Sequence, residues 1–252
     1  IFSLFFIKIF IIMNKTIYIC YKTLKEVKIY SNNWKKLNPD WNIELYDDNR
    51  CRDFLLKEFS QVFVDIFNYI EDGPIKSDFW RICVIYKYGG LYVDADIQPI
   101  APLKDYIDEN DKFVSCVSAY EPDHYMNPHF LLSFKGNPIL KKCINTYLKF
   151  YKENRPYSYW GWSICLIFRE IKLFKSIIKH KGSQEHIING LKFKFLQEIG
   201  KGSLKFCEFN GATVLYNSYN NSIYKDHQFV KRKTISLLDE KQIKEKEPTL
   251  NK

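Results

Sequence analysis

The segment KSDFWRICVIYKYGGLYVDADI, residues 76–97, constrains the fold more strongly than any other part of the 252-residue chain. It is mostly apolar and aromatic, yet charged side chains stand among its core-forming residues. These include Asp78, Arg81, Asp94 and Asp96. A buried charge without a partner costs several kcal/mol or shifts to its neutral form. We therefore expect these four charges to have partners, of which a bound metal ion or ligand is one kind.

The first part of this segment predicts a helix over residues 74–88. Pro74 suits the first turn of a helix, and Gly89–Gly90 ends it because glycine tolerates the left-handed C-terminal turn. Apolar residues occupy much of the helix circumference, which indicates that the helix is largely buried. Asp78 and Arg81 are three residues apart and share a face, so an internal ion pair that fixes the helix is one interpretation of them.

The second part predicts a strand over residues 91–93 that ends at Asp94. Alternate side chains of an extended chain point the same way, so Asp94 and Asp96 should present two carboxylates toward one point. Two close carboxylates repel each other unless a cation lies near them. Oxygen ligands suit Mg²⁺ and Mn²⁺, and Mg²⁺ is usually held by one or two carboxylates together with substrate phosphates. The pattern therefore favours a divalent-cation site at the end of this strand.

Hydrophobic periodicity predicts the remaining elements. Strands are expected at residues 16–21, 41–46, 113–118, 130–134, 206–209 and 212–216. Helices are expected at residues 27–37, 52–70, 137–148 and 162–179. Strands and helices alternate in the first half, which predicts an α/β fold with a mostly parallel central sheet and helices on both faces. Ligands of such sheets bind outside the carboxyl ends of the strands, where Asp94 and Asp96 are expected.

Charge and cysteine content narrow the class of protein. The formal net charge is +9, but the lysines are scattered, and no stripe of lysines alternating with aromatic residues indicates a nucleic-acid groove. None of the seven cysteines forms a C-x-x-C pair, and most have apolar neighbours. This pattern predicts reduced, buried thiols in a cytosol-like compartment rather than disulfides or a zinc site. We expect a cytoplasmic protein with no nucleic-acid partner, and peripheral contact with a membrane as the alternative location.

A single domain is expected over residues 13–238. Residues 1–12 (IFSLFFIKIFII) form an apolar extension that is short for a membrane span, which needs about 20 residues. Translated upstream sequence before Met13, a fragment of an anchor and an extra hydrophobic segment are three interpretations of it. Residues 239–252 form a polar tail in which Glu and Lys are interleaved.

Two blocks of residues resemble a known family. The pattern S-D-x-x-R followed by Y-G-G-x-Y-x-D-x-D, within residues 77–96, resembles the core of the DXD sugar transferases of glycosyltransferase family 32. That family includes relatives of the yeast initiating α-1,6-mannosyltransferase and of capsular polysaccharide synthesis proteins. The pattern W-K-K-x-N-P-x-W at residues 34–41 resembles the family's segment before its second strand. The similarity covers roughly residues 14–104 well and the remainder loosely.

The resemblance implies a Rossmann-like, nucleotide-sugar-binding fold of the type called GT-A. It implies a metal-dependent, retaining glycosyltransferase that moves a hexose from a nucleotide-diphosphate sugar to a glycan, lipid or protein acceptor. The implied cofactors are Mn²⁺, or Mg²⁺, and a UDP- or GDP-sugar as the donor. The sequence leaves the nucleotide, the sugar and the acceptor open.

Roles for the charged residues follow from the matching positions of the family. Asp96 would bind the metal ion directly. Asp94 would contact the hydroxyls of the ribose and the sugar, and would reach the metal ion through water. Asp78 and Arg81 would hold the donor sugar.

Other matching positions complete the implied site. Tyr21 stands where the family usually has a Trp that stacks on the nucleotide base, and Tyr can also stack. Gly90 belongs to the implied donor-binding set. His227 matches a family histidine that approaches the metal ion and the diphosphate, although the usual Trp-containing context is missing and an exposed loop histidine is the alternative. The WGW pattern at residues 160–162 falls where the family lines its acceptor side, with core packing as the alternative.

Two other classes of protein compete with this interpretation. Phosphatases of the haloacid dehalogenase type also place D-x-D after an apolar strand, but Gln98 stands where they prefer Thr or Val. A non-catalytic module that binds nucleotide sugars or glycans is the second alternative, although every carboxylate of the motif is present. Release of a nucleoside diphosphate from a sugar donor would separate a transferase from both.

Overall fold

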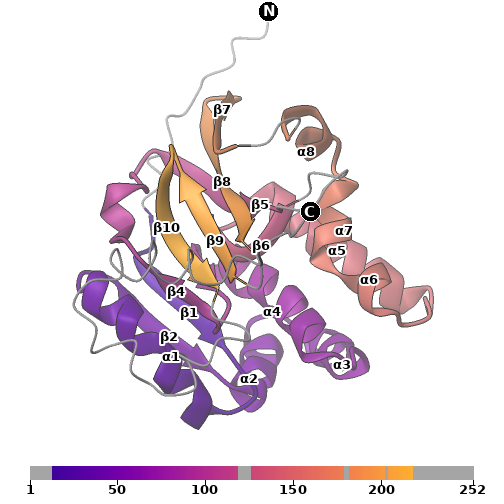
Figure 1. Ribbon diagram of the computed structural model, residues 1–252. Coiled ribbons are helices and arrows are strands. Elements are labelled where there is room, and N and C mark those ends of the chain that lie inside the picture. Colours follow the sequence, from indigo (N-terminus) through magenta and orange to yellow (C-terminus); the bar gives the residue numbers. More distant parts are fainter. Residues whose placement is uncertain (1–12, 119–125, 179–181, 202–203, 218–252) are drawn as a thin grey trace, which may run out of the picture.

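The computed structural model describes residues 13–118, 126–178, 182–201 and 204–217 (Figure 1). The first half of the chain contains β1 (Thr16–Cys20), α1 (Leu24–Leu37), β2 (Asn42–Tyr46), α2 (Asp48–Glu58), α3 (Gln61–Tyr69), α4 (Gly73–Tyr88), β3 (Gly90–Val93), β4 (Ile97–Pro99) and a 3₁₀ turn (Leu103–Asp105). The second half contains β5 (Asp111–Val117), β6 (Met126–Ser133), α5 (Pro138–Lys152), α6 (Tyr159–Trp162), α7 (Ile164–Arg169), α8 (Lys172–Ile177), β7 (Gln184–Ile188), β8 (Leu191–Lys201), β9 (Leu204–Phe209) and β10 (Ala212–Asn217).

The strands form one mixed sheet in the order β2-β1-β3-β6-β5-β8-β9-β10-β4, with β7 paired to β8. The pairs β1–β2, β1–β3 and β5–β8 are parallel, and the other six pairs of the described strands are antiparallel. The predicted α/β class is confirmed, but the mostly parallel sheet is wrong. The reason is that β6 runs opposite to both its neighbours, β3 and β5, and that β7–β8 and β9–β10 are hairpins.

Both hairpins turn on an Asn-Gly pair. Asn189 and Gly190 have φ of 51° and 76°, and Asn210 and Gly211 have φ of 50° and 82°. Two consecutive positive φ values are typical of the type I′ turn, whose twist matches that of the flanking strands. The Asn-Gly pairs therefore account for two antiparallel pairs of the C-terminal part of the sheet, β7–β8 and β9–β10.

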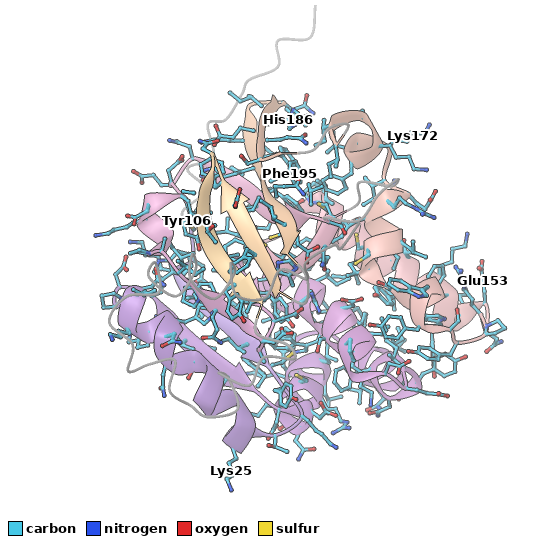
Figure 2. All side chains as sticks on the ribbon, in the orientation of Figure 1. Lys25, Tyr106, Glu153, Lys172, His186 and Phe195 are labelled. Atoms are coloured by element: carbon cyan, nitrogen blue, oxygen red, sulfur yellow. The ribbon has the colours of Figure 1, made fainter. Side chains whose placement is uncertain are left out.

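Hydrophobic cores cover both faces of the sheet. The strand β1 shows the division, because Tyr18 and Cys20 pack under helices α2–α5, whereas Ile17 and Ile19 pack under α1 and against β4 and β10. Figure 1 shows α3, α4, α5 and α7 grouped beside the sheet and β8–β10 curving across it. In Figure 2, Phe195 lies in the first of these cores and Tyr106 in the second, while Lys25 extends into solvent.

Two predicted helices are divided in the structure. Residues 52–70 contain most of α2 and all of α3, which are separated by Phe59 and Ser60. Residues 162–179 contain α7 and α8 rather than one helix. Among the described residues, no helix combines the length and the apolar character that a membrane crossing requires.

Candidate active site

Arg81 joins two carboxylates at the carboxyl end of β3. Helix α4 carries Asp78 and Arg81, and the chain leaves β3 at Asp94. The Arg81 Nη2 atom lies 3.0 Å from Asp78 Oδ1 and 3.0 Å from Asp94 Oδ1, and the Arg81 side chain is only 4% exposed. The sequence therefore brings three of its four predicted charges into one buried cluster. The internal ion pair between Asp78 and Arg81 is present, and Asp94 extends it.

The other guanidinium nitrogens of Arg81 also bind within the protein. Nε donates to the Ser77 carbonyl at 3.2 Å, and Nη1 donates to the Pro128 carbonyl at 2.8 Å. The guanidinium carbon also lies 4.5 Å from the centre of the Tyr92 ring. These contacts fix Arg81 firmly, so its role in the described structure is to position Asp78 and Asp94. Its predicted contact with a donor sugar stays a prediction.

Asp78 links α4 to the start of α7. Its Oδ2 atom accepts hydrogen bonds from the Ile164 backbone N–H at 3.0 Å and from the Ser163 hydroxyl at 3.3 Å. Burial raises the pKa of the Asp78 carboxyl to about 6, although the Arg81 charge and the Ile164 N–H both favour the ionised form. Asp78 thus anchors two helices around the site. Its predicted contact with a sugar also stays a prediction.

Asp94 is the more accessible carboxylate of the cluster. The Tyr92 hydroxyl donates to Asp94 Oδ1 at 2.6 Å, and the same oxygen forms the ion pair with Arg81. The side chain of Asp94 is 30% exposed, compared with 9% for Asp78. Within the described residues, Asp94 Oδ2 has no hydrogen bond or ion pair. One oxygen is therefore held by the protein, and the other is available for a ligand.

Asp96 reaches the site through a turn rather than through an extended strand. The Ile97 N–H donates to the Asp94 carbonyl at 3.0 Å, so residues 94–97 turn between β3 and β4. The predicted extended conformation of this segment is wrong, because β4 must reverse to pair with β10. Asp96 is half-buried, and burial together with the charge of Asp94 raises the pKa of its carboxyl to about 6.

This electrostatic strain is what a bound cation would relieve. Burial is the larger cause of the raised pKa of Asp96 and the charge of Asp94 the smaller one, and a nearby divalent ion would offset both by favouring the ionised carboxylates. Their oxygen atoms are the ligands that Mn²⁺ and Mg²⁺ prefer. The residues present at this turn therefore fit the metal ion that the resemblance implies.

Tyr21 follows β1 at the same edge of the sheet. Strand β1 is parallel to β3, and Tyr18 pairs with Tyr92, so the two strands end side by side. Tyr21 is 42% exposed, and its backbone N–H donates to the Tyr46 carbonyl at 3.0 Å. The ring is therefore accessible near the carboxylates, and its stacking on a base stays a prediction.

The backbone geometry explains why residue 90 is a glycine, without any contact with a ligand. Its φ is 104°, and a Cβ atom there would lie 2.7 Å from the Thr16 carbonyl oxygen of β1. Gly89, with φ of 71°, ends α4 and donates its N–H to the Ile85 carbonyl at 2.8 Å. The two glycines let the chain turn sharply from α4 into β3 and pack closely on β1. The assignment of Gly90 to donor binding stays a prediction.

The upstream block at residues 34–41 supports the turn from behind. Trp34 is fully buried, and its Nε1 donates to the Ile97 carbonyl at 2.9 Å. Asn38 Oδ1 accepts from the Leu103 N–H at 2.7 Å. The upstream block therefore holds the chain that follows Asp96, at β4 and at the 3₁₀ turn.

Three further predicted positions have different outcomes. His227 lies outside the described residues. Trp162 is fully buried and packs in the core, as the alternative interpretation predicted, whereas Trp160 is 59% exposed. Tyr159 stacks edge-on against Trp160 at 5.2 Å. The pair lies on α6, just before Ser163, whose hydroxyl donates to Asp78, so the two rings are close in sequence to the site.

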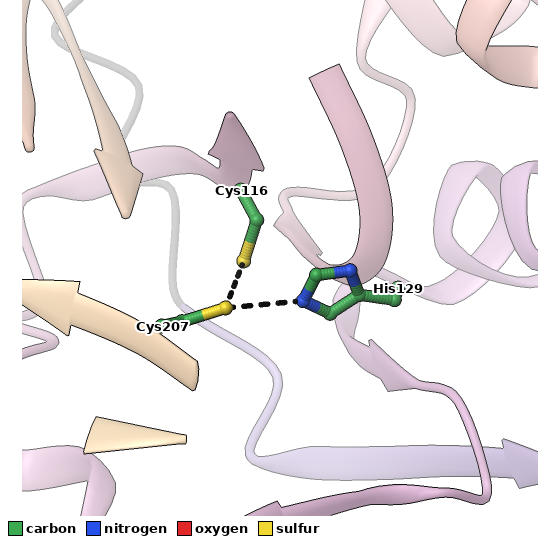
Figure 3. Close-up of side chains that lie close together, drawn as sticks. All are labelled: Cys116, His129 and Cys207. Atoms are coloured by element: carbon green, nitrogen blue, oxygen red, sulfur yellow. Dashed lines mark hydrogen bonds between the residues drawn. The ribbon is translucent and has the colours of Figure 1, made fainter. Parts of the chain in front are cut away.

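The sequence did not predict a group of side chains next to the DXD turn. Cys116, His129 and Cys207 come together in the core (Figure 3). The His129 carbonyl accepts the backbone N–H of Asp94 at 2.8 Å, and the charge of His129 lowers the pKa of Asp96. The three residues are far apart in the sequence, so spacing arguments did not bring them together. Only the shared apolar context of the two cysteines could have indicated a common core.

Known proteins are similar in sequence to the part of the chain that contains the DXD turn. Residues 25–114 match the family model described as "Glycosyltransferase sugar-binding region containing DXD motif". The chain is 25% identical over 85 residues to the Initiation-specific alpha-1,6-mannosyltransferase of Candida albicans, a match that covers 32% of this chain and 22% of the relative. It is 29% identical over 125 residues to Inositol phosphoceramide mannosyltransferase 1 of Schizosaccharomyces pombe, covering 47% of this chain and 37% of the relative. The chain thus spans well under half the length of these curated relatives.

Some solved structures of glycosyltransferases resemble this chain, at low sequence identity. The PaToxG glycosyltransferase is 19% identical with a TM-score of 0.43, and the match covers 66% of this chain and 73% of that one. The apo form of the glycosyltransferase GlyE of Streptococcus pneumoniae is 16% identical with a TM-score of 0.40, and the match covers 65% and 44%. Through residues 25–114, the chain is similar in sequence to the glycosyltransferases whose sugar-binding region contains a DXD motif.

Proposed function

We propose that the protein is a metal-dependent glycosyltransferase that moves a hexose from a nucleotide-diphosphate sugar to an acceptor. The observation that carries the proposal is the position of Asp94, which Arg81 and Tyr92 hold by one oxygen at the end of β3. Asp96 follows in the same turn, and burial together with the charge of Asp94 raises the pKa of its carboxyl. This pair lies within the segment that matches the DXD family.

Each residue has a distinct part in the proposed reaction. Asp96 and the accessible oxygen of Asp94 would hold the metal ion. When bound, the ion would neutralise the negative charge that develops on the leaving nucleoside diphosphate. Arg81 and Tyr92 keep Asp94 in one orientation, so little reorganisation is needed when the donor binds. Tyr21 would offer its ring to the nucleotide base.

We also propose which donor and which kind of acceptor to test. Two relatives are mannosyltransferases by name, so GDP-mannose is the first donor to test, followed by UDP-hexoses. The exposed pair Tyr159 and Trp160 offers an apolar platform beside Asp78, which suits a sugar ring of a glycan or glycolipid acceptor. The retaining stereochemistry implied by the resemblance remains part of this proposal.

A donor-hydrolysis assay tests the proposal. The wild-type chain should release nucleoside diphosphate from its donor when Mn²⁺ is present, and Asp96→Asn should lower this rate by about 100-fold or more. Asp40→Asn is the matched control, because Asp40 is an exposed carboxylate paired with Lys15. Unchanged hydrolysis in Asp96→Asn would refute the metal assignment. Donor binding without turnover would instead favour the non-catalytic module, and release of phosphate from simple esters would favour the phosphatase.

A further inference from the structure

Three side chains with metal-binding atoms meet on the inner side of the curved sheet. Cys116 is in β5, His129 in β6 and Cys207 in β9, and all three are at most 3% exposed. The two sulfur atoms are 3.5 Å apart, and His129 Nε2 is 3.2 Å from Cys207 Sγ. The three atoms all lie within 4.8 Å of one another (Figure 3).

These distances are close to those around a tetrahedral zinc ion. Zinc binds thiolate sulfur at about 2.3 Å and imidazole nitrogen at about 2.0–2.1 Å. A tetrahedral arrangement then separates two sulfur atoms by about 3.8 Å, and a sulfur from a nitrogen by about 3.6 Å. The two measured separations are within about 0.4 Å of these values. A disulfide between Cys116 and Cys207 fits less well, because it needs the sulfur atoms at about 2.05 Å.

The surroundings of His129 favour a metal ligand over an ordinary core histidine. Its Nε2 contacts only sulfur, which is a weak hydrogen-bond partner. Within the described residues, its Nδ1 is buried without a hydrogen-bond partner. A metal–nitrogen bond at Nε2 would replace the weak sulfur contact with a strong one, although Nδ1 would keep its present surroundings. Two thiolates and one divalent cation also sum to zero charge, so the ion and its two sulfur ligands add no net charge to the core.

We propose that Cys116, His129 and Cys207 bind one thiophilic divalent cation, for which Zn²⁺ is the probe. The site differs in chemistry from the carboxylate pair, because soft sulfur ligands select zinc whereas carboxylates suit manganese and magnesium. It also has a structural consequence. Strand β9 pairs with β8 and β10 but not with β5 or β6. The ion would therefore link β9 to two strands of the same sheet with which it forms no direct pair. The proposal departs from the expectation from spacing alone, which was that the cysteines form no zinc site.

Metal content of the full chain tests this proposal. Protein purified under reducing conditions should hold about one zinc ion per chain by elemental analysis and native mass spectrometry. Replacement by Co²⁺ should produce a thiolate-to-cobalt charge-transfer band, which carboxylate ligands do not give. Cys207→Ala and Cys116→Ala should lose the band and retain less than about a tenth of the metal. Cys143→Ala is the matched control, because Cys143 is equally buried but lies in the other core.

The outcomes separate this site from the proposed active site. Asp96→Asn should keep the zinc and the cobalt band, even where it abolishes donor hydrolysis. If the cysteine variants fail to fold, the wild-type protein decides the question through its zinc content and cobalt spectrum. Folded wild-type protein that binds no zinc and gives no thiolate band would overturn the proposal. A mass lower by two hydrogens, with Cys116 and Cys207 linked in a peptide map, would also overturn it in favour of a disulfide.

Discussion

Replacing Arg81 with methionine tests how strongly the buried carboxylates depend on this guanidinium. Arg81 lies 3.0 Å from both Asp78 and Asp94, and its side chain is 4% exposed. Methionine is also long and unbranched but has no charge, so the variant keeps much of the packing while removing the ion pairs and the hydrogen bonds to the Ser77 and Pro128 carbonyls. Breaking a buried ion pair from one side costs about 3–5 kcal/mol. We expect a loss of that size in the free energy of unfolding near pH 8.

The loss should depend on pH in a direction that the structure sets. Burial raises the pKa of Asp78 to about 6 from its ordinary value of 3.8, even with Arg81 present. Without Arg81 that pKa rises further, so folded Asp78 holds a proton that unfolded Asp78 releases. Stability then falls as pH rises through this window. The difference between wild type and variant should grow by about 1.4 kcal/mol per pH unit from pH 6 up to the pKa of Asp78 in the variant.

Urea unfolding at pH 5 and pH 8 measures both the loss in the free energy of unfolding and its dependence on pH. Arg169→Met is the control, because Arg169 pairs with Glu170 at 3.7 Å and is 41% exposed, and such surface pairs contribute about 0–1 kcal/mol. The double variant Asp78→Asn with Arg81→Met should lose most of the pH dependence. A loss in Arg81→Met no larger than in the control, or one equal at both pH values, would refute the reasoning.

Two further changes test the supports of the site. Gly90→Ala should destabilise the fold by at least about 1–3 kcal/mol, because φ is 104° and the new Cβ would meet the Thr16 carbonyl at 2.7 Å. Gly73→Ala is its control, since nothing lies within 4 Å there, and equal effects in the two variants would contradict the assignment. Tyr92→Phe removes the 2.6 Å hydrogen bond to Asp94 and should cost about 1.5–3 kcal/mol in urea unfolding. A change below about 0.5 kcal/mol would show that this bond contributes little.

The best predicted part of the fold is the segment from α4 to β3. Pro74 and Gly89 mark its boundaries with residues whose backbone preferences are strong, and the helix indeed covers Gly73–Tyr88. The face shared by Asp78 and Arg81 also followed from helix geometry alone. Local rules were sufficient here because every determinant lies within one helix and its ends.

The errors occurred where distant parts of the chain decide the structure. Ser60 begins a new helix inside a stretch whose apolar spacing is continuous, because α3 must pack against both α4 and α5. The strand β7 could have been found from the Asn189–Gly190 pair, which is a strong hairpin signal. The antiparallel direction of β6 has no such local signal.

The candidate site shows the same division. The presence of Asp94 and Asp96 was predictable from the motif, but the turn between them depends on β4 pairing with β10. The contact between Arg81 and Asp94 crosses from one element to another, so spacing could not indicate it. Cys116, His129 and Cys207 meet only after three separate strands are in place.

The pairing of β4 with β10 determines when the site can form during folding. Ile97, just after the DXD turn, pairs with Asn217, which lies much later in the chain. Contacts between residues so distant in sequence are slow to form, because a long loop must close first. Strand β3 and helix α4 are near neighbours and can assemble early, whereas the far side of the turn must wait for the last hairpin. A nascent chain that ends before residue 212 would therefore carry both aspartates without the strand pairing that shapes the turn between them.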